Sequence, residues 1–382
     1  MRVAFVTEMW KPSANGLVTR LAATIDELTG LGHQVLVIAP SLGPADATVE
    51  PQAGVTVRRV PSYRVPWIYG GQPWGWPLPR VRRFLADFRP DIVHLISPFS
   101  LGIAGVLGAR QLREPLVSSF HTDIAAYSAS YRMGWLQPVI WLILRSLHNA
   151  GTATLVTSRH SQDLLGRHGI RHIALWRRGV SLARFDAAAP PGPAPAVVPS
   201  GVDPARPTVL YVGRLADEKG LDRLLPMARS GQVHLVLVGD GPARERLERD
   251  FTGTGTTFTG ELRGPALARA YAEADVFAFA STTDTLGLVL LEALASGLPV
   301  VAVESPASRE LLAGLPVARL VDPKRPADFL PMVAELMAWK TPAERAAIAR
   351  QEAAPWTWAK ATEQLLDYYS QVLRRTGCAG SA

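Results

Sequence analysis

Cysteine is nearly absent from this chain of 382 residues, whose single one is Cys378, close to the C-terminus. One thiol excludes a disulfide framework and a metal site made of several cysteines. No stretch approaches the ~18 uninterrupted apolar residues that a membrane-spanning helix needs. The N-terminal string MRVAFVTEMW has the pattern of a strand, so we expect no signal peptide. These absences favour a cytoplasmic protein and leave peripheral attachment to the inner face of the plasma membrane open.

Lysine is also scarce, with 5 lysines against 35 arginines, and the charge is unevenly spread. Residues 1–186 carry 20 basic against 11 acidic residues, a net charge of +9, whereas the remainder carries 20 against 22, a net charge of −2. A basic first half predicts an acidic partner, either an anionic membrane surface or a nucleic acid. The aromatic residues show no nucleic-acid-binding signature, so we favour the membrane and expect no nucleic acid.

Strand-like and helix-like segments alternate along both halves of the sequence, which is typical of parallel sheets covered by helices on both faces. The length suits two domains, and residues 187–207 between the halves are rich in alanine and proline, as linkers are. We therefore predict an α/β protein with two Rossmann-like domains, residues 1–186 and 203–355. We expect them to face each other, with the ligand in the cleft at the carboxyl ends of the strands.

The expected elements follow from apolar runs and their spacing. The predicted strands are residues 3–7, 34–39, 55–60, 92–95, 116–120, 154–157, 208–212, 234–238, 257–259, 276–280, 300–303 and 317–320. The predicted helices are residues 17–31, 78–88, 101–112, 135–148, 159–168, 220–229, 243–250, 264–273, 286–296, 327–338 and 358–374. The helix at 135–148 is apolar almost all round, so we expect it in the core.

The most informative segment is residues 281–301, STTDTLGLVLLEALASGLPVV, in which Asp284 precedes Glu292 by eight positions. The apolar run between them predicts a buried helix face, and the neighbouring threonines can cap the helix start, which would suit a diphosphate. Eight helical residues span about 12 Å, so the two carboxylates could contact opposite ends of a nucleotide-sugar. A surface helix with two solvated carboxylates is the alternative, although Glu292 lies among apolar residues and there needs a partner.

A basic pair, Arg214 and Lys219, follows a predicted strand in the string YVGRLADEKG. Two cations beyond a strand end suit a diphosphate, and Gly213 and Gly220 allow close backbone approach. The spacing alone fits a solvated strand–helix loop equally well.

These motifs resemble those of glycosyltransferase family four, whose members are retaining enzymes with the GT-B fold. The segment from Asp284 to Glu292 is similar to its E-x7-E signature, and the string around Arg214 and Lys219 to its G-R-L-x-x-E-K-G motif. The strings FHTDIAAY (residues 120–127) and WRRGV (176–180) are similar to a subgroup of mannosyltransferases and sulfoquinovosyl- and glucuronosyl-transferases that glycosylate membrane lipids. The chain departs from the family in having Asp284 where the first Glu is normal.

The resemblance covers nearly the whole chain and implies a set of site residues. His121, Arg214, Lys219 and Asp284 are the predicted catalytic residues, with the basic pair on the diphosphate and Asp284 on the sugar hydroxyls. His121 would lie near the sugar's C6 hydroxyl, although a lone histidine is more commonly structural. The predicted donor-binding residues are Gly16, Gly260, Leu262, Thr285, Leu286, Gly287, Leu288 and Glu292. The weaker candidates for the acceptor are Arg20, Tyr127 and Tyr131.

The resemblance also implies that a C-terminal helix, residues 356–376, crosses back to the first domain.

The resemblance further implies a transfer reaction and its substrates. A hexose, mannose in the first place, would pass from a nucleotide-diphosphate sugar to a hydroxyl of a lipid or glycolipid acceptor. We expect GDP-mannose before a UDP-sugar as donor, and neither a metal nor another cofactor. One alternative is a UDP-sugar-dependent transferase acting on a soluble or natural-product acceptor, and another is a non-catalytic nucleotide-sugar-binding protein. A Rossmann dehydrogenase would need G-x-G-x-x-G after a first strand, which neither half contains.

An aromatic segment, residues 63–79, contains three tryptophans and two tyrosines and is followed by Arg80, Arg82 and Arg83. Aromatic side chains beside arginines are typical of a membrane interface. The alternative is an aromatic loop packed into its own domain.

Overall fold

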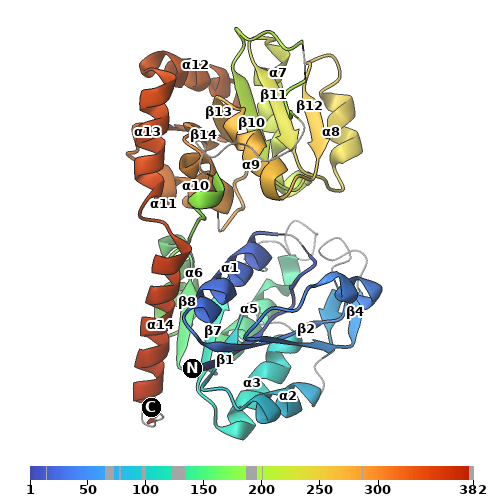
Figure 1. The fold of residues 1–382 in the computed structure, drawn as a ribbon, viewed down its shortest axis with the longest axis vertical. Helices are drawn as coiled ribbons and strands as arrows, with labels where there is room; N and C mark the ends of the chain where they lie inside the picture. The colour runs from blue at the N-terminus through green and yellow to red at the C-terminus, as the bar shows by residue number, and fades with distance from the viewer. Residues whose placement is uncertain are drawn as a thin grey trace. The chain divides into compact units, whose positions relative to one another are not determined.

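The computed structural model describes residues 1–13, 15–64, 73–76, 79–96, 100–121, 125, 134–185, 196–199, 201–285 and 287–377. The chain divides into two compact units (Figure 1). Unit 1 comprises Met1–Arg178 with Trp358–Ala382, and unit 2 comprises Gly179–Thr357. Each unit is built on one parallel sheet, so the predicted α/β fold class is confirmed.

Unit 1 has a seven-stranded sheet in the order β3-β2-β1-β6-β7-β8-β9, and every neighbouring pair is parallel. Its five inner strands are largely buried, as expected of a sheet that is covered on both faces, whereas the edge strands β3 and β9 are partly exposed. They are β1 (Arg2–Val6), β2 (Gln34–Pro40), β3 (Val55–Val60), β6 (Ile92–Leu95), β7 (Leu116–Phe120), β8 (Ala153–Val156) and β9 (Ile173–Leu175). A separate antiparallel pair, β4 (Ser62–Arg64) with β5 (Pro73–Gly75), was not predicted.

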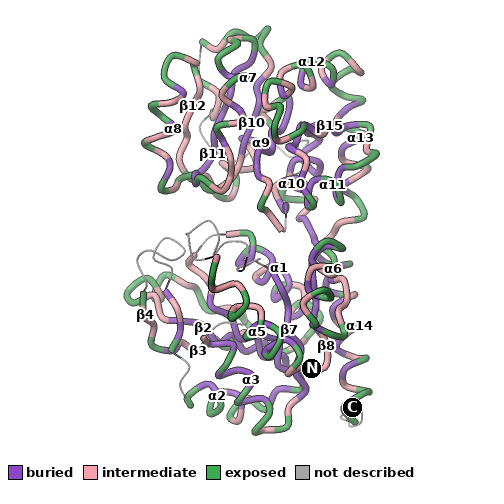
Figure 2. The backbone as a smooth tube through the Cα atoms, turned by 180° about the vertical axis from the view of Figure 1, so that it is seen from behind, coloured by how far each residue is buried: buried purple, intermediate pink, exposed green. Residues whose placement is uncertain are grey.

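Two layers of helices cover this sheet. α1 (Gly16–Gly30) and the C-terminal helix α14 (Trp358–Arg375) pack on one face and share a core cluster. The other face is covered by α2 (Arg80–Phe88), α3 (Ser100–Leu112), α5 (Gln137–His148) and α6 (Arg159–Arg167). The return of the chain to unit 1 through α14 agrees with the prediction. Figure 2 shows the strands largely buried and the outer sides of the helices exposed.

Unit 2 has a six-stranded parallel sheet in the order β12-β11-β10-β13-β14-β15. This order reverses between β10 and β13, where ligands of doubly wound sheets bind. The strands are β10 (Thr208–Val212), β11 (His234–Val238), β12 (Thr257–Gly260), β13 (Val276–Phe279), β14 (Val300–Val303) and β15 (Ala318–Val321).

The helices of unit 2 also form two layers. One face of the sheet is covered by α7 (Leu225–Arg229), α8 (Arg244–Asp250) and α12 (Phe329–Trp339). The other is covered by α9 (Gly264–Ala272), α10 (Leu288–Ala295), α11 (Pro306–Leu312) and α13 (Pro342–Ala353). Among the helices in the described parts of the chain, none combines the length and apolar character that crossing a bilayer requires.

Candidate active site

The two motif loops of unit 2 meet at the point where its strand order reverses. Lys219 ends the short 3-10 helix η5 (Asp217–Lys219) after β10, and Asp284 lies in the loop after β13. The Lys219 Nζ and Asp284 Oδ1 atoms form an ion pair, and the two side chains are 19% and 22% exposed. The same loops are joined by Thr283, whose hydroxyl donates to the Glu218 carbonyl at 3.1 Å.

We expected Lys219 on the diphosphate and Asp284 on the sugar, and in the structure these two side chains contact each other. An ammonium group has three N–H donors and a carboxylate has two oxygens. The pair therefore leaves each group with capacity for a ligand while fixing where the two charges lie.

Close backbone packing holds the loop that carries Arg214. The amide of Gly213 donates to the Val238 carbonyl at 3.0 Å, and the amide of Leu215 donates to the Asp240 carbonyl at 3.0 Å. A Cβ atom on Gly239 would lie 1.9 Å from the Gly213 carbonyl oxygen, so a side chain there would separate the loops after β10 and β11. The Arg214 side chain itself is exposed at the strand end.

The helix after Asp284 begins later than predicted. α10 starts at Leu288, and its N-cap is Gly287 with φ 55°, without a side-chain cap. The predicted threonine caps are wrong, because Thr283 bonds to Ser281 and Glu218 instead. Asp284 consequently lies outside the helix, and the estimate of about 12 Å along the helix axis does not apply. Leu286 lies outside the described residues.

Glu292 has a partner that the sequence analysis did not identify. The Tyr271 hydroxyl on α9 donates to Glu292 Oε2 at 2.9 Å, and Tyr271 is fully buried. Burial raises the pKa of the Glu292 carboxyl, and the Tyr271 hydrogen bond and the charge of Arg184 oppose that shift. Nothing in the string ALARAYAEAD marks Tyr271 as a functional residue, because it lies 21 positions from Glu292 and meets it only through helix packing.

The residues predicted near the nucleotide base lie after β12. Gly260 has a φ of 77°, and its carbonyl accepts hydrogen bonds from the Gly239 amide and the Thr259 hydroxyl, both at 2.8 Å. Leu262 is partly buried against the core that includes α9 and α10. Base recognition by these two residues stays a prediction.

In unit 1, His121 follows β7 and is buried beside Trp176. Its Nε2 atom lies 2.8 Å from the Ser119 hydroxyl, and its ring meets the edge of the indole with centroids 5.8 Å apart. Burial lowers the pKa of His121 well below its usual range, and the charge of Arg20 adds to the shift. The imidazole is therefore neutral at physiological pH.

Arg20 is also buried and is held by the same tryptophan. Its Nη2 donates to the carbonyls of Trp176 and Arg177 at 3.0 and 2.8 Å, and its guanidinium lies 3.7 Å from the ring centroid of Trp176. These contacts give Arg20 a structural role where unit 1 ends, and its predicted contact with the acceptor stays a prediction. The other acceptor candidates, Tyr127 and Tyr131, lie outside the described residues.

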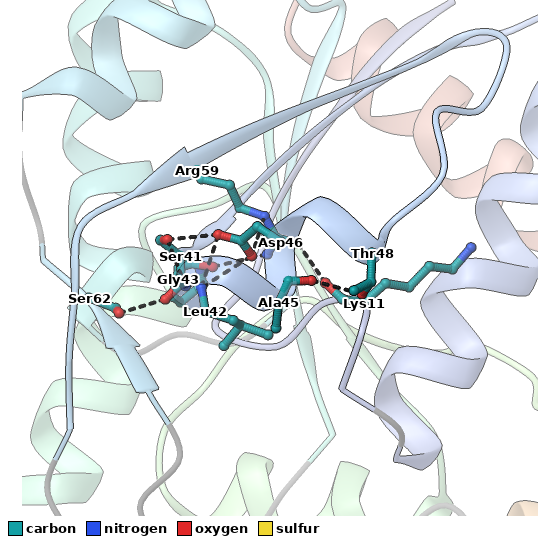
Figure 3. A network of polar contacts seen from close by, with 10 residues as sticks. Lys11, Ser41, Leu42, Gly43, Ala45, Asp46, Thr48, Arg59 and Ser62 are labelled. Carbon is teal, nitrogen blue, oxygen red and sulfur yellow. Dashed lines mark hydrogen bonds and ion pairs between the residues drawn. The ribbon is translucent and has the colours of Figure 1, made fainter.

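The segment that leads from Lys11 to Gly16 at the start of α1 has contacts at both of its ends. Asn15 caps the helix by accepting from the Val18 amide at 2.9 Å, and Gly16 is the first helical residue. Arg59 donates to the Lys11 carbonyl at 2.5 Å and is paired with Asp46 at 3.3 Å, as Figure 3 shows. The loop position therefore depends on the edge of the sheet at β3.

No group of three or more His, Cys, Asp or Glu side chains in the described ranges is arranged to hold a metal ion.

Two parallel sheets of this kind, each covered by helices on both faces, define the fold class of the protein as GT-B. Among solved structures, the fold is similar to sucrose-phosphate synthase from Thermosynechococcus elongatus, with a TM-score of 0.77 and 20% identity over 98% of this chain and 99% of that one. The match shows the fold.

The chain belongs to Glycosyltransferase Family 4, whose family model matches residues 14–184, and a model of glycosyl transferases group 1 matches residues 206–338. It is 38% identical to a GDP-mannose-dependent alpha-mannosyltransferase from Mycolicibacterium smegmatis, over 98% of both chains. It is 27% identical to an alpha-monoglucosyldiacylglycerol synthase from Streptococcus pneumoniae, over 82% of this chain and 73% of that protein. The protein is thus a glycosyltransferase.

Proposed function

We propose that this glycosyltransferase moves mannose from GDP-mannose to a hydroxyl of a lipid or glycolipid acceptor, with retention of configuration and without a metal ion. The observation that carries the proposal is the contact of Lys219 with Asp284, which joins the two motif loops that follow the neighbouring strands β10 and β13. The name of the relative from Mycolicibacterium smegmatis supports GDP-mannose as donor, and that of the relative from Streptococcus pneumoniae supports a lipid acceptor.

In this proposal, unit 2 binds the donor. Glu292 is oriented by Tyr271 through Oε2, and its Oε1 atom accepts from the ribose hydroxyls. Arg214 and Lys219 bind the diphosphate, and Asp284 turns its second oxygen to the hydroxyls of the sugar. Arg214 suits this role because its guanidinium is exposed beside the end of β10.

The reaction follows from that charge arrangement. The acceptor oxygen bonds to the anomeric carbon on the face from which the diphosphate leaves, and the bond between that carbon and the phosphate oxygen breaks. The hydroxyl proton passes to the departing diphosphate. Arg214 and Lys219 stabilise the negative charge that develops there, which is the task a metal ion performs in other transferases.

Purified full-length protein tests the donor and the reaction together. A thermal-shift panel should show greater stabilisation by GDP-mannose than by UDP-sugars, because a ligand that binds only the folded state raises its stability by mass action. Mannose should pass to a lipid acceptor, and EDTA should leave the rate unchanged. Stabilisation by UDP-sugars and not by GDP-mannose would refute the assignment of GDP-mannose as the donor. Binding without transfer or donor hydrolysis would favour a non-catalytic binding protein.

A further inference from the structure

One face of unit 1 exposes large apolar side chains. Contrary to the predicted core position, the helix α5 buries only Leu144, Leu147 and His148 fully. Its outer side carries Val139, Leu142 and Ile143, which are 53%, 55% and 46% exposed, and the preceding Trp135 is 76% exposed. The prediction failed because an apolar composition all round does not specify which side of a helix meets the sheet.

The exposed apolar surface continues onto the neighbouring helix α3. Ile103 and Leu107 point outward from α3, which packs beside α5. We call these six residues the α3/α5 surface. In the described parts of the chain, just two other large apolar side chains, Leu31 and Trp76, are comparably exposed. A concentration of this kind marks an interaction site rather than the usual scatter of apolar side chains.

The same helical layer is strongly basic. The helices α2, α3, α5 and α6 contain seven arginines and two aspartates, a net charge of +5. On the opposite face of the sheet, α1 and α14 together contain four basic and four acidic residues, a net charge of zero. The layer with the exposed apolar side chains therefore carries the excess positive charge.

An open pocket of about 1120 Å³ lies beside α5. It is lined by aromatic, apolar and basic side chains that include Trp135, Trp141, Leu142, Arg145, Arg167 and His168. Trp141 stacks on His168, with ring centroids 3.7 Å apart and planes 2° apart. The described residues that line the pocket include no Asp or Glu, so it suits an anionic group attached to an apolar chain.

We propose that the α3/α5 surface docks on a bilayer that contains anionic lipids, and that the pocket beside α5 receives an anionic lipid headgroup. Apolar side chains enter the interface while the surrounding arginines meet the negative surface potential. A second copy of the chain fits less well, because a symmetric contact would bring two basic layers together. The inference deepens the proposed function, in which the acceptor is a lipid.

Cosedimentation of the full chain with vesicles tests this proposal without any donor. Binding should be strong to vesicles that contain phosphatidylglycerol, weak to pure phosphatidylcholine, and lower at high salt. The double variant Leu142→Gln/Ile143→Gln should bind at least ~10-fold more weakly, because it removes apolar area from the interface. Arg145→Gln/Arg167→Gln should weaken vesicle binding by a similar factor, because it removes two positive charges that attract the anionic lipids.

Matched controls lie on the opposite layer. Leu31→Gln replaces a residue that is 62% exposed, and Arg374→Gln/Arg375→Gln removes two charges from α14, so both should bind vesicles like the wild type. Donor hydrolysis without acceptor should be equal in all variants, and a thermal unfolding scan should show that they are folded.

Three results would overturn the proposal. Wild-type binding by Leu142→Gln/Ile143→Gln would exclude the surface. Loss of binding in Trp76→Ala/Arg82→Gln/Arg83→Gln, with the α5 variants unaffected, would assign docking to the aromatic segment instead. Dimers in sedimentation velocity that the α5 variant abolishes would assign the surface to a second copy. If the protein neither hydrolysed nor transferred sugar from any donor, the proposed function would be refuted, and the result of the vesicle experiment would still hold.

Discussion

At the scale of single residues, the hydrogen bond from Tyr271 to Glu292 gives a paired test. Glu292→Gln should weaken donor binding by roughly 1.5–3 kcal/mol, the range of hydrogen bonds to charged groups. Tyr271→Phe removes just the hydroxyl that orients the carboxylate, so it should cost less, about 1 kcal/mol. Calorimetry with GDP measures both, and unchanged affinity in Glu292→Gln would exclude the ribose contact.

The basic pair and Asp284 should differ in what their loss changes. Arg214→Ala and Lys219→Ala should each lower kcat at least ~100-fold, as removal of one oxyanion stabiliser does. Of these two variants, only Lys219→Ala should also lower the unfolding temperature, because it leaves the partly buried Asp284 without this partner.

The carboxylate of Asp284 gives a separate test. Asp284→Asn should reduce kcat far more than nucleotide affinity, and Asp284→Glu should keep measurable activity. Transfer at the wild-type rate by Asp284→Asn would reduce this carboxylate to a structural role.

The sequence singles out candidate site residues that belong to motifs, and it gives no sign of neighbours that only packing brings to them. Arg214, Lys219, Asp284 and Glu292 stand at fixed spacings that can be recognised in the string. Tyr271 reaches Glu292 from a different helix. Trp176 donates to the Ala361 carbonyl, which lies 185 positions further along the chain. A single sequence contains no signal for contacts of this kind.

At the scale of elements, the start of α10 depends on Gly287. Its φ of 55° is left-handed, and an added Cβ atom would lie 3.3 Å from Leu290 Cδ1. Gly287→Ala should therefore destabilise the protein by about 1–2 kcal/mol. Gly30→Ala is the matched control, since nothing lies within 4 Å of a Cβ atom there, and alanine favours the helix. Urea titration compares the two variants, and equal unfolding midpoints for both would show that alanine at position 287 causes no backbone strain.

Elements with strong apolar runs were predicted within a few residues, and weaker ones were missed. The strand β9 has three partly buried residues and lies at the sheet edge, so its pattern is faint. α11 begins in the string ESPASRELL, where the N-cap Ser305 forms a capping box with Ser308 and Pro306 is the first helical residue. That box is a helix start that apolar periodicity does not reveal. α13 also begins with a capping box, at Thr341, but it shows little apolar periodicity.

At the scale of the whole molecule, acid should destabilise unit 1. Burial lowers the pKa of His94 and of His148 to about 3, with the charge of Arg20 adding to the shift at His94. The unfolded chain therefore binds more protons below about pH 6.5, and stability falls as the pH falls from there towards 3. Each such histidine should cost about 1.4 kcal/mol per pH unit.

Urea titrations between pH 7.5 and 5.5 measure this slope. The variant His148→Gln should have a shallower pH dependence than the wild type, whatever its stability at pH 7.5. A matched change at His160, which is exposed on α6, should leave the slope unaltered. A slope that His148→Gln does not reduce would mean that this histidine is protonated in the folded protein.

The chain leaves unit 1 after Arg178 and returns at Trp358, and the return completes the core of unit 1. The Trp176 indole donates to the Ala361 carbonyl at 3.0 Å, and His94 Nδ1 lies 2.6 Å from the Tyr369 hydroxyl, both on α14. When residues 1–178 have been synthesised, the partners of Trp176 and His94 on α14 have therefore not yet been synthesised. Although domains commonly fold in the order of their synthesis, unit 2 is here the first that can finish folding, and unit 1 must wait for the last helix.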